Sequence, residues 1–496
     1  MMKKNRVLLV DPPTKTPQSL NIGLGWLAAN LTDVCEDVRV LALANIVCPP
    51  PEAHQLLQKA VASFHPEIVG INIHCTTYKI ALSLVKELRP YFNGLIVVGG
   101  PHAVYEQNRI LEQGPEIDAV VMGEAEHTFA EICRRERGQY DGIEGVIYRK
   151  NDQIIVNLIK VRSREFGALR HPDYRQFGIT KILSAYPIST SRGCPFNCCF
   201  CNPFMGGKFW RPRPLDDFFK ELEYARATFG IKSFVLVEPV FNLQEERVIE
   251  FCRQLQERKI NLPWYCGSGL RADRLSPKMV RAMKQAGCTH IKIGVESLVP
   301  EVFEHVNKGE TLQQIREGVK IVKKEKIPLT GSFIIGLPHD TLERARLNFH
   351  LSQELGFDYT EWSLLFPYPG TKAYDWMMQH GKIYHTIETA HQVAGDLWDQ
   401  DFRRPVTVNI ACDSPEFPKE DRLTAFWEIN TKSGNYIFSL RNSDWVKMKT
   451  IAQAIWRYDR KRMFWHAKRI LKLLYRRMIM MNKKGERVEF ATTAFE

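Results

Sequence analysis

The chain has 496 residues, of which 44% are hydrophobic and 25% charged, so it is long enough for two or three domains with sizeable cores. The formal net charge of +12 lies mostly in residues 446–486, which hold 13 Lys and Arg against 2 Asp and Glu, and this excludes a protein that is basic throughout. Only four apolar residues, Val7–Val10, follow the basic N-terminus, and no apolar run reaches the ~18 residues of a membrane span, so we expect a cytoplasmic protein.

Residues 1–140 alternate short apolar strands with amphipathic helices. The predicted strands are Arg6–Val10, Val38–Leu43, Glu67–Ile73, Leu95–Val98 and Ile117–Val121. The predicted helices are Leu24–Leu31, Ala53–Phe64, Ile80–Leu88, Val104–Leu111 and Thr128–Arg135. This alternation predicts an α/β domain with a doubly wound parallel sheet, in which a ligand binds at the carboxyl ends of the strands.

Residues 141–184 indicate a connector, with a hairpin that turns at Asn151-Asp152. A second series of strands and helices fills residues 185–383. Its predicted strands are Ile188–Ser191, Ser233–Val237, Trp264–Gly269, His290–Val295, Gly331–Ile335 and Glu361–Phe366. Its predicted helices include Leu215–Phe229, Glu245–Arg258, Pro277–Gln285, Leu312–Lys324 and Thr341–Leu355. These units predict a partial (β/α)6 barrel, with its chemistry at the carboxyl ends of the strands.

The barrel pattern is lost in residues 384–496. Here the stretch Val446–Met481 mixes Lys and Arg with large apolar residues, which predicts a basic helical tail. Such a helix either packs against the barrel with its basic residues outward, which we favour, or lies on an anionic membrane surface. Nucleic acid is not expected as a partner, because a single basic stripe without a known binding fold is little support for it.

Eight of the twelve cysteines stand alone, as expected of buried thiols in a reducing compartment, whereas four cluster between Cys194 and Cys201. Cys194, Cys198 and Cys201 have the spacing C-x3-C-x2-C, and three thiolates on one loop suit an iron–sulfur cluster, zinc or copper(I). A structural zinc site takes four ligands, usually as two pairs, and no second pair follows. Three cysteines on a [4Fe–4S] cluster instead leave one iron open to a small molecule.

This motif, with Phe200 before its last cysteine and a strand before its first, resembles that of the radical S-adenosylmethionine (SAM) superfamily. The resemblance implies that the open iron binds SAM, whose one-electron reduction yields methionine and a 5′-deoxyadenosyl radical. Cys199 breaks the family's spacing, and we interpret it as non-ligating. Later matches to the family, at or near the ends of the predicted strands, imply a SAM site built from Phe200, Glu238, Arg271, Gly294, Glu296, Ser297 and Gly336. Glu238 stands where relatives more often carry Asp.

The N-terminal region resembles the cobalamin (B12)-binding domain that precedes many radical SAM barrels, in Val7–Pro13 and in the runs Gly99-Gly100-Pro101-His102 and Gly123-Glu124-Ala125-Glu126. A nucleotide or phosphate site is the alternative, but neither G-x-G-x-x-G nor a P-loop motif is found. The resemblance implies a cobalamin site at Pro13, Thr76, Thr77, Gly99, Gly100, His102, Gly123 and Glu124. No histidine follows the first strand, so His74 and His102 are the nearest candidates for a cobalt ligand. A domain that keeps the fold without cobalamin is the remaining alternative.

Together these resemblances imply an enzyme with a [4Fe–4S] cluster, SAM and cobalamin, which carries a methyl group to an unactivated carbon or a phosphorus of a small-molecule or lipid-like substrate. A cobalamin-dependent cyclase, oxidase or rearrangement enzyme without methyl transfer is the first alternative. A non-catalytic module that senses cobalamin or redox state is the second. The expected partners are a one-electron donor such as flavodoxin or ferredoxin and, through the basic tail, a membrane surface to which the protein would be peripheral.

Overall fold

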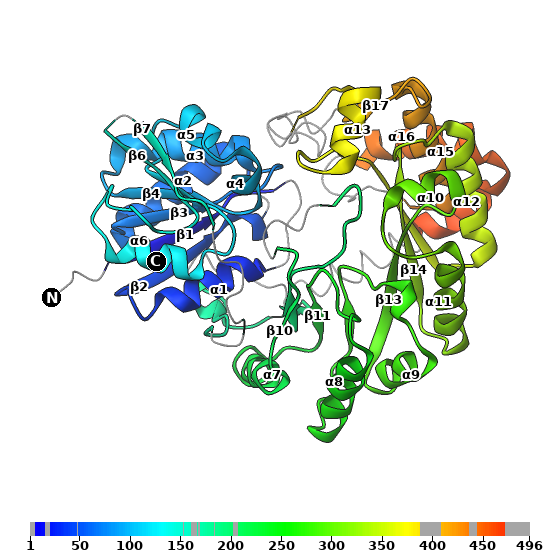
Figure 1. Cartoon of the computed structure of the whole chain (residues 1–496), viewed down its shortest axis with the longest axis horizontal. Coiled ribbons are helices and arrows are strands. Elements are labelled where there is room, and N and C mark those ends of the chain that lie inside the picture. Colours follow the sequence, from blue (N-terminus) through cyan, green and yellow to red (C-terminus); the bar gives the residue numbers. More distant parts are fainter. Residues whose placement is uncertain are drawn as a thin grey trace.

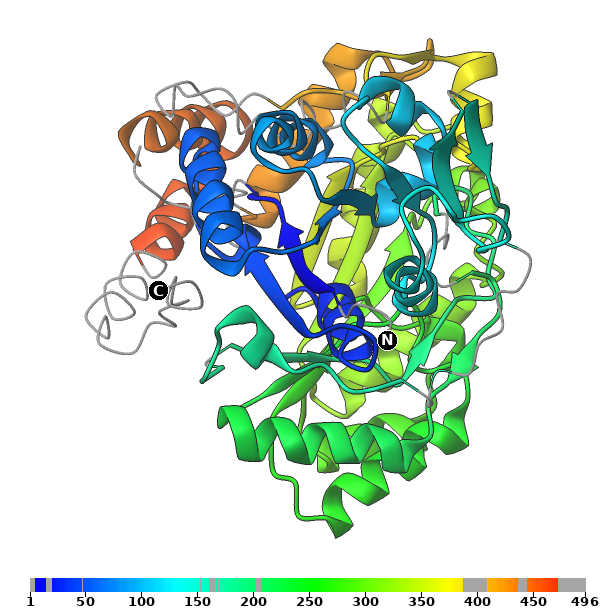
Figure 2. The same cartoon turned by 90° about the vertical axis from the view of Figure 1, so that its left-hand side faces the viewer.

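The computed structural model describes residues 5–14, 20–46, 48–151, 153–159, 166, 169–182, 184–201, 207–386, 408–435 and 444–471. Two α/β units lie side by side, and the C-terminal helices pack on the second of them (Figure 1). Turned by 90°, the N-terminal unit lies in front of the barrel sheet (Figure 2). The predicted tail Val446–Met481 lies within the described residues only as far as 471.

The first sheet has the strand order β2-β1-β3-β4-β5-β6-β7 and is parallel from β2 to β5. Its strands are β1 Arg6–Asp11, β2 Asp37–Ala42, β3 Ile68–Asn72, β4 Leu95–Gly99, β5 Ala119–Val121, β6 Val146–Lys150 and β7 Gln153–Val156. Its helices are α1 Ile22–Leu31, α2 Pro50–Phe64, α3 Tyr78–Leu88, α4 Pro101–Glu106, α5 Arg109–Gln113 and α6 Glu126–Arg134. The strand order reverses between β1 and β3, which is where a doubly wound sheet opens a crevice for a ligand.

Alternate residues of β1 enter two different cores, because successive side chains of a strand point to opposite faces. Val7 and Leu9 pack into one buried cluster with helices α1 and α6, whereas Leu8 and Val10 pack into another with helices α2 and α3. Both faces of the sheet are therefore covered by helices, and the predicted doubly wound fold is confirmed.

The hairpin expected in the connector is present, but it extends the first sheet. β6 pairs antiparallel with β5, with Val120 opposite Ile147, and β7 pairs antiparallel with β6. Ile147 is fully buried in the same cluster as Val120. The period-two pattern of this segment therefore reflects an edge of the N-terminal sheet, because a hairpin with one apolar face must bury that face against a neighbour.

The second sheet is parallel and has the order β15-β14-β13-β12-β11-β8. Its strands are β8 Tyr186–Ile188, β11 Phe234–Leu236, β12 Trp264–Cys266, β13 Cys288–Glu296, β14 Leu329–Ile335 and β15 Tyr359–Leu364. Its helices are α7 Leu215–Phe229, α8 Glu245–Glu257, α9 Pro277–Gln285, α10 Pro300–Val306, α11 Leu312–Lys324 and α12 Leu342–Leu355. The predicted partial six-stranded barrel is confirmed, with α10 as a helix that the sequence pattern did not reveal.

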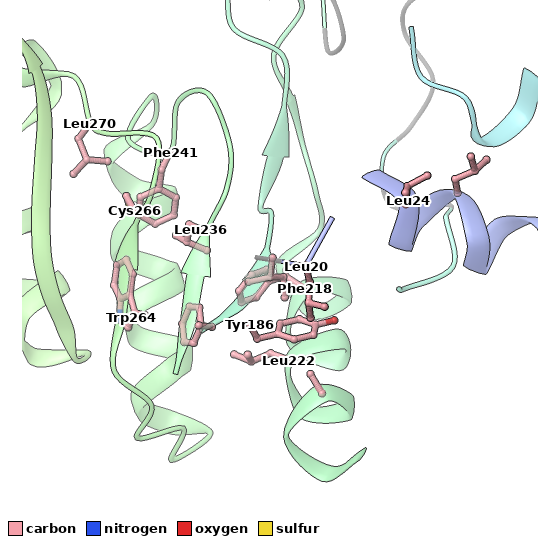
Figure 3. Close-up of a cluster of buried hydrophobic side chains, with 14 of the residues drawn as sticks. Leu20, Leu24, Tyr186, Phe218, Leu222, Leu236, Phe241, Trp264, Cys266 and Leu270 are labelled. Carbon is pink, nitrogen blue, oxygen red and sulfur yellow. The ribbon is translucent and has the colours of Figure 1, made fainter. Parts of the chain in front are cut away.

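One buried cluster runs from the first unit into the second. Leu20 and Leu24 belong to the same cluster as Tyr186, Phe218 and Trp264 of the barrel (Figure 3). Burial of this shared apolar surface stabilises the arrangement of the two units, since the hydrophobic effect scales with the area removed from water.

Helix α13 Lys372–His380 follows the last barrel strand, and the C-terminal region contains α15 Lys419–Ser433 and α16 Asp444–Asp459. Short strands β16 Lys382–Ile383 and β17 Cys412–Asp413 pair antiparallel. Single 3-10 turns occur at Leu43–Asn45, Arg89–Tyr91, Tyr174–Phe177, Ala272–Arg274 and Arg460–Arg462. Helix α15 packs on α12, β14 and β15, and α16 packs on α15, so the first part of the tail lies against the barrel.

In the described parts of the chain, no helix combines the length and the apolar character that crossing a bilayer requires.

Candidate active site

The cysteine motif lies on a loop whose two ends pair as a ribbon, β9 Ser191–Arg192 with β10 Arg211–Pro212. The Cys194 N–H donates to the carbonyl of Gly207 at 3.1 Å, and the Cys201 N–H donates to the carbonyl of Cys198, also at 3.1 Å. The loop therefore folds back on itself directly after the first barrel strand, at the carboxyl end of the sheet.

Cys199 is more deeply buried than the other three cysteines of the motif. Its side chain is 2% exposed and packs in an apolar cluster with Val299, Val306 and Ala373, whereas Cys194 and Cys198 are half-buried and Cys201 is exposed. Its N–H donates to the Val306 carbonyl at 2.7 Å, and its carbonyl accepts from the Ala373 N–H at 2.9 Å. Cys199 thus anchors the loop to helices α10 and α13.

The three remaining thiols, Cys194, Cys198 and Cys201, are the candidate cluster donors on the loop. Burial is the main reason why the pKa of Cys198 rises to about 12 and that of Cys201 to about 11, and the charge of Cys194 adds to both. Within the described residues, no three His, Cys, Asp or Glu side chains are placed to hold a single metal ion. The set fits a [4Fe–4S] cluster nonetheless, because each thiolate binds a different iron and the thiols need not meet at one point.

Glu238 lies beneath the turn that enters the cysteine loop. It is 3% exposed, and its carboxylate accepts from the backbone N–H groups of Thr190 and Ser191 at 2.7 and 2.5 Å and from their hydroxyls at 2.9 and 3.0 Å. Burial raises the pKa of Glu238 to about 7, against the effect of these hydrogen bonds. The carboxylate is therefore engaged in fixing the backbone that leads to the cysteines.

Arg271 is buried in a network of charges and contacts the cysteine loop through Phe196. Its guanidinium donates to Asp273 at 2.9 and 3.1 Å and to the Lys308 carbonyl at 2.8 Å, and it lies 3.5 Å from the ring centroid of Phe196. Phe196 belongs to the loop, so this cation–π contact joins the loop to the barrel. The Lys308 ammonium lies 3.5 Å from Glu296 and 3.2 Å from Glu310.

The remaining residues of the expected SAM site lie at the ends of β13 and β14. A Cβ on Gly294 would come within 2.7 Å of the Glu296 carboxylate and 3.0 Å of the Lys308 ammonium, so a larger residue here would force the ion pair to shift. Glu296 has a φ of +66°, and the buried Ser297 hydroxyl accepts from the N–H of Val299 at 3.2 Å.

Gly336 has a φ of +87° and lies against the tail. A Cβ there would approach a guanidinium nitrogen of Arg422 to 2.4 Å, and that nitrogen donates to the Gly336 carbonyl at 3.1 Å. Arg422 is fully buried on α15. Helix α15 therefore reaches the end of β14, a contact that the sequence pattern did not suggest. Phe200 lies nearby, partly buried against the cluster that holds Cys199.

A cavity of about 430 Å³ lies at the carboxyl ends of the first sheet, between the two units. Residues of β1, β3, β4 and β5 and of the turns after them form one wall, which includes Gly99, Gly100, Gly123 and Glu124. The barrel supplies the opposite wall, which includes Arg192 and Gly193 of the cysteine loop together with Ser189, Ser191, Val237 and Pro239. Most of the lining is apolar, as expected of a site for a large organic cofactor.

The other residues of the expected cobalamin site do not line this cavity. Pro13 and Thr77 are buried, and Thr76 Oγ1 lies 3.1 Å from Nδ1 of His74, which is exposed and does line the cavity. His102 is fully buried against Tyr78, with 4.0 Å between ring centroids, and neither of its ring nitrogens has a hydrogen-bond partner among the described residues. Burial lowers the pKa of His102 to about 3, so its ring is neutral.

Comparisons with known proteins match both units. A family model for the radical SAM superfamily matches residues 188–349, and a model for the B12 binding domain matches residues 18–133. An uncharacterized methyltransferase of Pyrococcus horikoshii is 30% identical over 402 residues, which are 77% of this chain and 85% of that protein. The chain belongs to the cobalamin-binding radical SAM family.

More distant members of the family share parts of the chain. An anaerobic magnesium-protoporphyrin IX monomethyl ester cyclase of Rubrivivax gelatinosus is 25% identical over 63% of this chain, which spans 59% of the cyclase. The radical SAM methyltransferase TsrM from Kitasatospora setae, solved with cobalamin and a [4Fe–4S] cluster, has the same fold with a TM-score of 0.63 and 20% identity, over 75% of this chain and 74% of that chain.

As a cobalamin-binding radical SAM enzyme, the chain uses a [4Fe–4S] cluster, SAM and cobalamin, as the sequence predicted. Its chemistry takes a small-molecule substrate and a source of electrons. The cavity fits cobalamin on two observations. Its lining includes glycines, which let backbone approach a large ligand. It also includes the polar side chains of Asn21 and Asn72, which are fixed because their amides donate to the buried Asp11 at 3.1 and 2.9 Å.

Several buried charged residues near the expected SAM site could not be predicted from the sequence. Lys308 follows α10 and meets Glu296 only through the fold, with Glu310 as its second partner. Arg422 reaches Gly336 from α15. A buried Lys or Arg carries no local pattern that separates it from a surface residue. The run Lys308-Gly309-Glu310, with Asn307 and Gly309 at positive φ, was the one available sign of a tight turn.

Proposed function

We propose that this chain is a cobalamin-dependent radical SAM methyltransferase that methylates an unactivated carbon or a phosphorus of a small-molecule or lipid-like substrate. The observation that carries the proposal is that the cavity's barrel wall includes Arg192 and Gly193, the two residues directly before Cys194. A cofactor in the cavity would therefore adjoin the cluster loop. When bound, the cofactors supply a methyl carrier and a substrate-activating radical.

The protein's own residues bind, orient and exclude water. We propose that Cys194, Cys198 and Cys201 hold the cluster, while Cys199 keeps the loop on the barrel. The ends of β13 and β14, with Phe200, Gly294, Glu296, Ser297 and Gly336, would form the SAM site. For Glu238 and Arg271 we propose positioning roles, because Glu238 fixes Thr190 and Ser191 and Arg271 supports Phe196.

For the cobalamin site we propose Gly99, Gly100 and Gly123 as the positions where backbone approaches the ligand. Thr76 lies beside His74 at the cavity's edge, and Thr77 orients that turn by accepting the His74 N–H at 3.1 Å. Pro13 and His102 are buried and do not line the cavity, so for them we propose a role in packing behind the residues that do. Of the two histidines, His74 is the one placed to reach a ligand.

The test is anaerobic reconstitution with iron, sulfide and hydroxocobalamin, followed by incubation with reductant, a cell extract and SAM labelled in its methyl group. Methyl transfer predicts a labelled product heavier than its precursor by one methylene, together with 5′-deoxyadenosine. A product without label, formed with the same SAM cleavage, would instead support the second candidate, a cyclase-type reaction, which the likeness to the cyclase favours. Flavodoxin or ferredoxin is the electron donor we propose for the cell.

We also propose that the helix over residues 463–471 lies on an anionic membrane surface. Phe464 is 93% exposed and Leu471 65%, and their spacing of seven residues, about two turns, places both on one side of the helix. Met463, the residue before Phe464, is 53% exposed and lies next to that side. The opposite side faces the protein, where His466 is fully buried beside Asp459 at 2.8 Å. Exposed basic residues flank the apolar side: Arg460, Lys461 and Lys468. An apolar face with a basic rim suits an anionic lipid surface.

Replacing Phe464 and Leu471 with Glu should lower binding to vesicles that contain phosphatidylglycerol by about tenfold or more, because burying each side chain is worth roughly 1.5–3 kcal/mol. Co-sedimentation measures the bound fraction, and Leu347→Glu, at a 47% exposed site on α12, is the matched control. The membrane proposal would be contradicted if the wild-type protein did not bind these vesicles. It would also be contradicted if the protein bound neutral vesicles equally well in high salt.

A further inference from the structure

The base of the cysteine loop carries two arginines that face the N-terminal unit. In the β9–β10 ribbon Arg192 is paired with Arg211, so the residue that enters the loop lies beside the residue that leaves it. Any group that binds both side chains holds both ends of the loop at once.

Two glutamates of the N-terminal unit bind these arginines. Arg211 donates to both carboxylate oxygens of Glu124, at 2.9 and 2.5 Å, and Arg192 donates to Glu126 at 2.7 Å and lies 3.6 Å from Glu124. Glu124 directly follows Gly123 in the turn after β5, and Glu126 is the first residue of α6. Fork-to-fork pairing of this kind fixes geometry as well as charge. We call these four residues the interdomain latch.

The latch is shielded from solvent on its Arg192 side. The side chain of Glu126 is 8% exposed and that of Arg192 17%. The Arg192 guanidinium lies 4.4 Å from the ring centroid of Phe166 and 5.4 Å from that of Trp26. Burial alone would raise the pKa of Glu126, but the charge and hydrogen bond of Arg192 lower it below its usual range. Removing one partner of such a pair leaves the other charge buried and unpaired, which is costly.

The latch also forms part of the cavity. Glu124, Glu126 and Arg192 all line it, together with Gly123 and Gly193. One set of charged contacts therefore joins the cavity wall to both ends of the loop that carries the cluster cysteines. A ligand in the cavity would press on the same side chains that close the loop.

We propose that Glu124 and Glu126 are positioning residues that couple the cobalamin cavity to the cluster loop. Filling of the cavity then strengthens the hold on Arg192 and Arg211 at the two ends of the loop, and firmly held ends favour binding in the cavity, because coupling between two sites is reciprocal. This assigns Glu124 to a contact between the units, where the sequence indicated a cobalamin contact. The inference rests on the two cofactors named above, but not on methyl transfer.

The test compares wild type with a variant that carries Glu124→Gln and Glu126→Gln, both with a reconstituted cluster. The measurement is the rate of cluster loss to an iron chelator, followed by absorbance, with and without hydroxocobalamin. In wild type, hydroxocobalamin should slow the loss by about tenfold, within the usual range of coupling between sites. In the variant the ratio should fall to about one, while the Glu124→Asp, Glu126→Asp variant should keep most of it.

Glu131→Gln is the control, because Glu131 is on α6 of the same unit and pairs with Arg134 at an exposed site. A second readout needs no cofactor: amide hydrogen exchange in residues 207–213 should be faster in the double Gln variant than in the control. Equal ratios in wild type and double variant, or a wild-type ratio of one, would overturn the latch. Wild type that forms no cluster or binds no hydroxocobalamin would contradict the cofactor sites themselves, a failure that the exchange data keep separate from that of the latch.

Discussion

Replacing Cys198 with Ala is expected to abolish the cluster and the reductive cleavage of SAM. Cys198 supplies one of the three thiols on the loop, and two thiols cannot hold three irons while the fourth iron binds SAM. The loss should exceed the roughly 10- to 100-fold cost of removing an outer partner of a metal site, and reach the assay background. Cluster absorbance and anaerobic release of 5′-deoxyadenosine measure the two effects.

Cys199→Ala is the matched control, because Cys199 is adjacent in the chain but buried among Val299, Val306 and Ala373. It should keep its cluster and its SAM cleavage while losing stability by about 1 kcal/mol, the scale of a small deletion in a core. A wild-type cluster in Cys198→Ala, or none in Cys199→Ala, would show that the ligand set is different. Zinc in place of iron would refute the central assignment.

Replacing Gly23 with Trp is expected to lower the affinity for hydroxocobalamin by about 5- to 150-fold, because an indole in the cavity must be displaced before the ligand enters, at a cost of about 1–3 kcal/mol. Gly23 lines the cavity, and a Cβ there would meet no atom closer than 3.4 Å, so the protein itself should accept the change. Absorbance titration of the anaerobic protein measures the affinity.

Lys59→Trp is the control, since it places the same side chain on the exposed surface of α2 in the same unit. SAM cleavage by the Gly23→Trp enzyme should persist, because the cysteine loop does not include Gly23. Unchanged cobalamin affinity would mean that the ligand binds elsewhere than in this cavity. Loss of the cluster as well would indicate a general disturbance of the fold.

The elements of the barrel could be predicted closely from the sequence. The helices Leu215–Phe229, Pro277–Gln285 and Leu312–Lys324 have the predicted bounds, because their apolar faces repeat with the helical period and their ends carry clear signals. Thr311 and Gln314, for example, form a capping box at the start of the third. The cysteine spacing likewise required no structure, since three ligands on one short loop are local by nature.

The fate of individual side chains could not be predicted in this way. Glu124 stands in a turn typical of a ligand site but binds Arg211, and Glu238 stands at a strand end but binds Thr190 and Ser191. His102 follows two glycines at a promising turn and is buried beside Tyr78. In each case the partner is distant in the chain, and a single sequence shows only local patterns, so it does not specify such a pairing.

The sequence by itself determined the two α/β units, their order and the three cysteines, because hydrophobic period and ligand spacing are properties of short segments. Only the tertiary structure decided that the hairpin joins the first sheet and that Lys308 meets Glu296. It also decided that Glu124 and Glu126 bind the two arginines at the ends of the cysteine loop. The reason is physical: a buried charge is stable only beside a partner, and the packing of whole elements selects that partner.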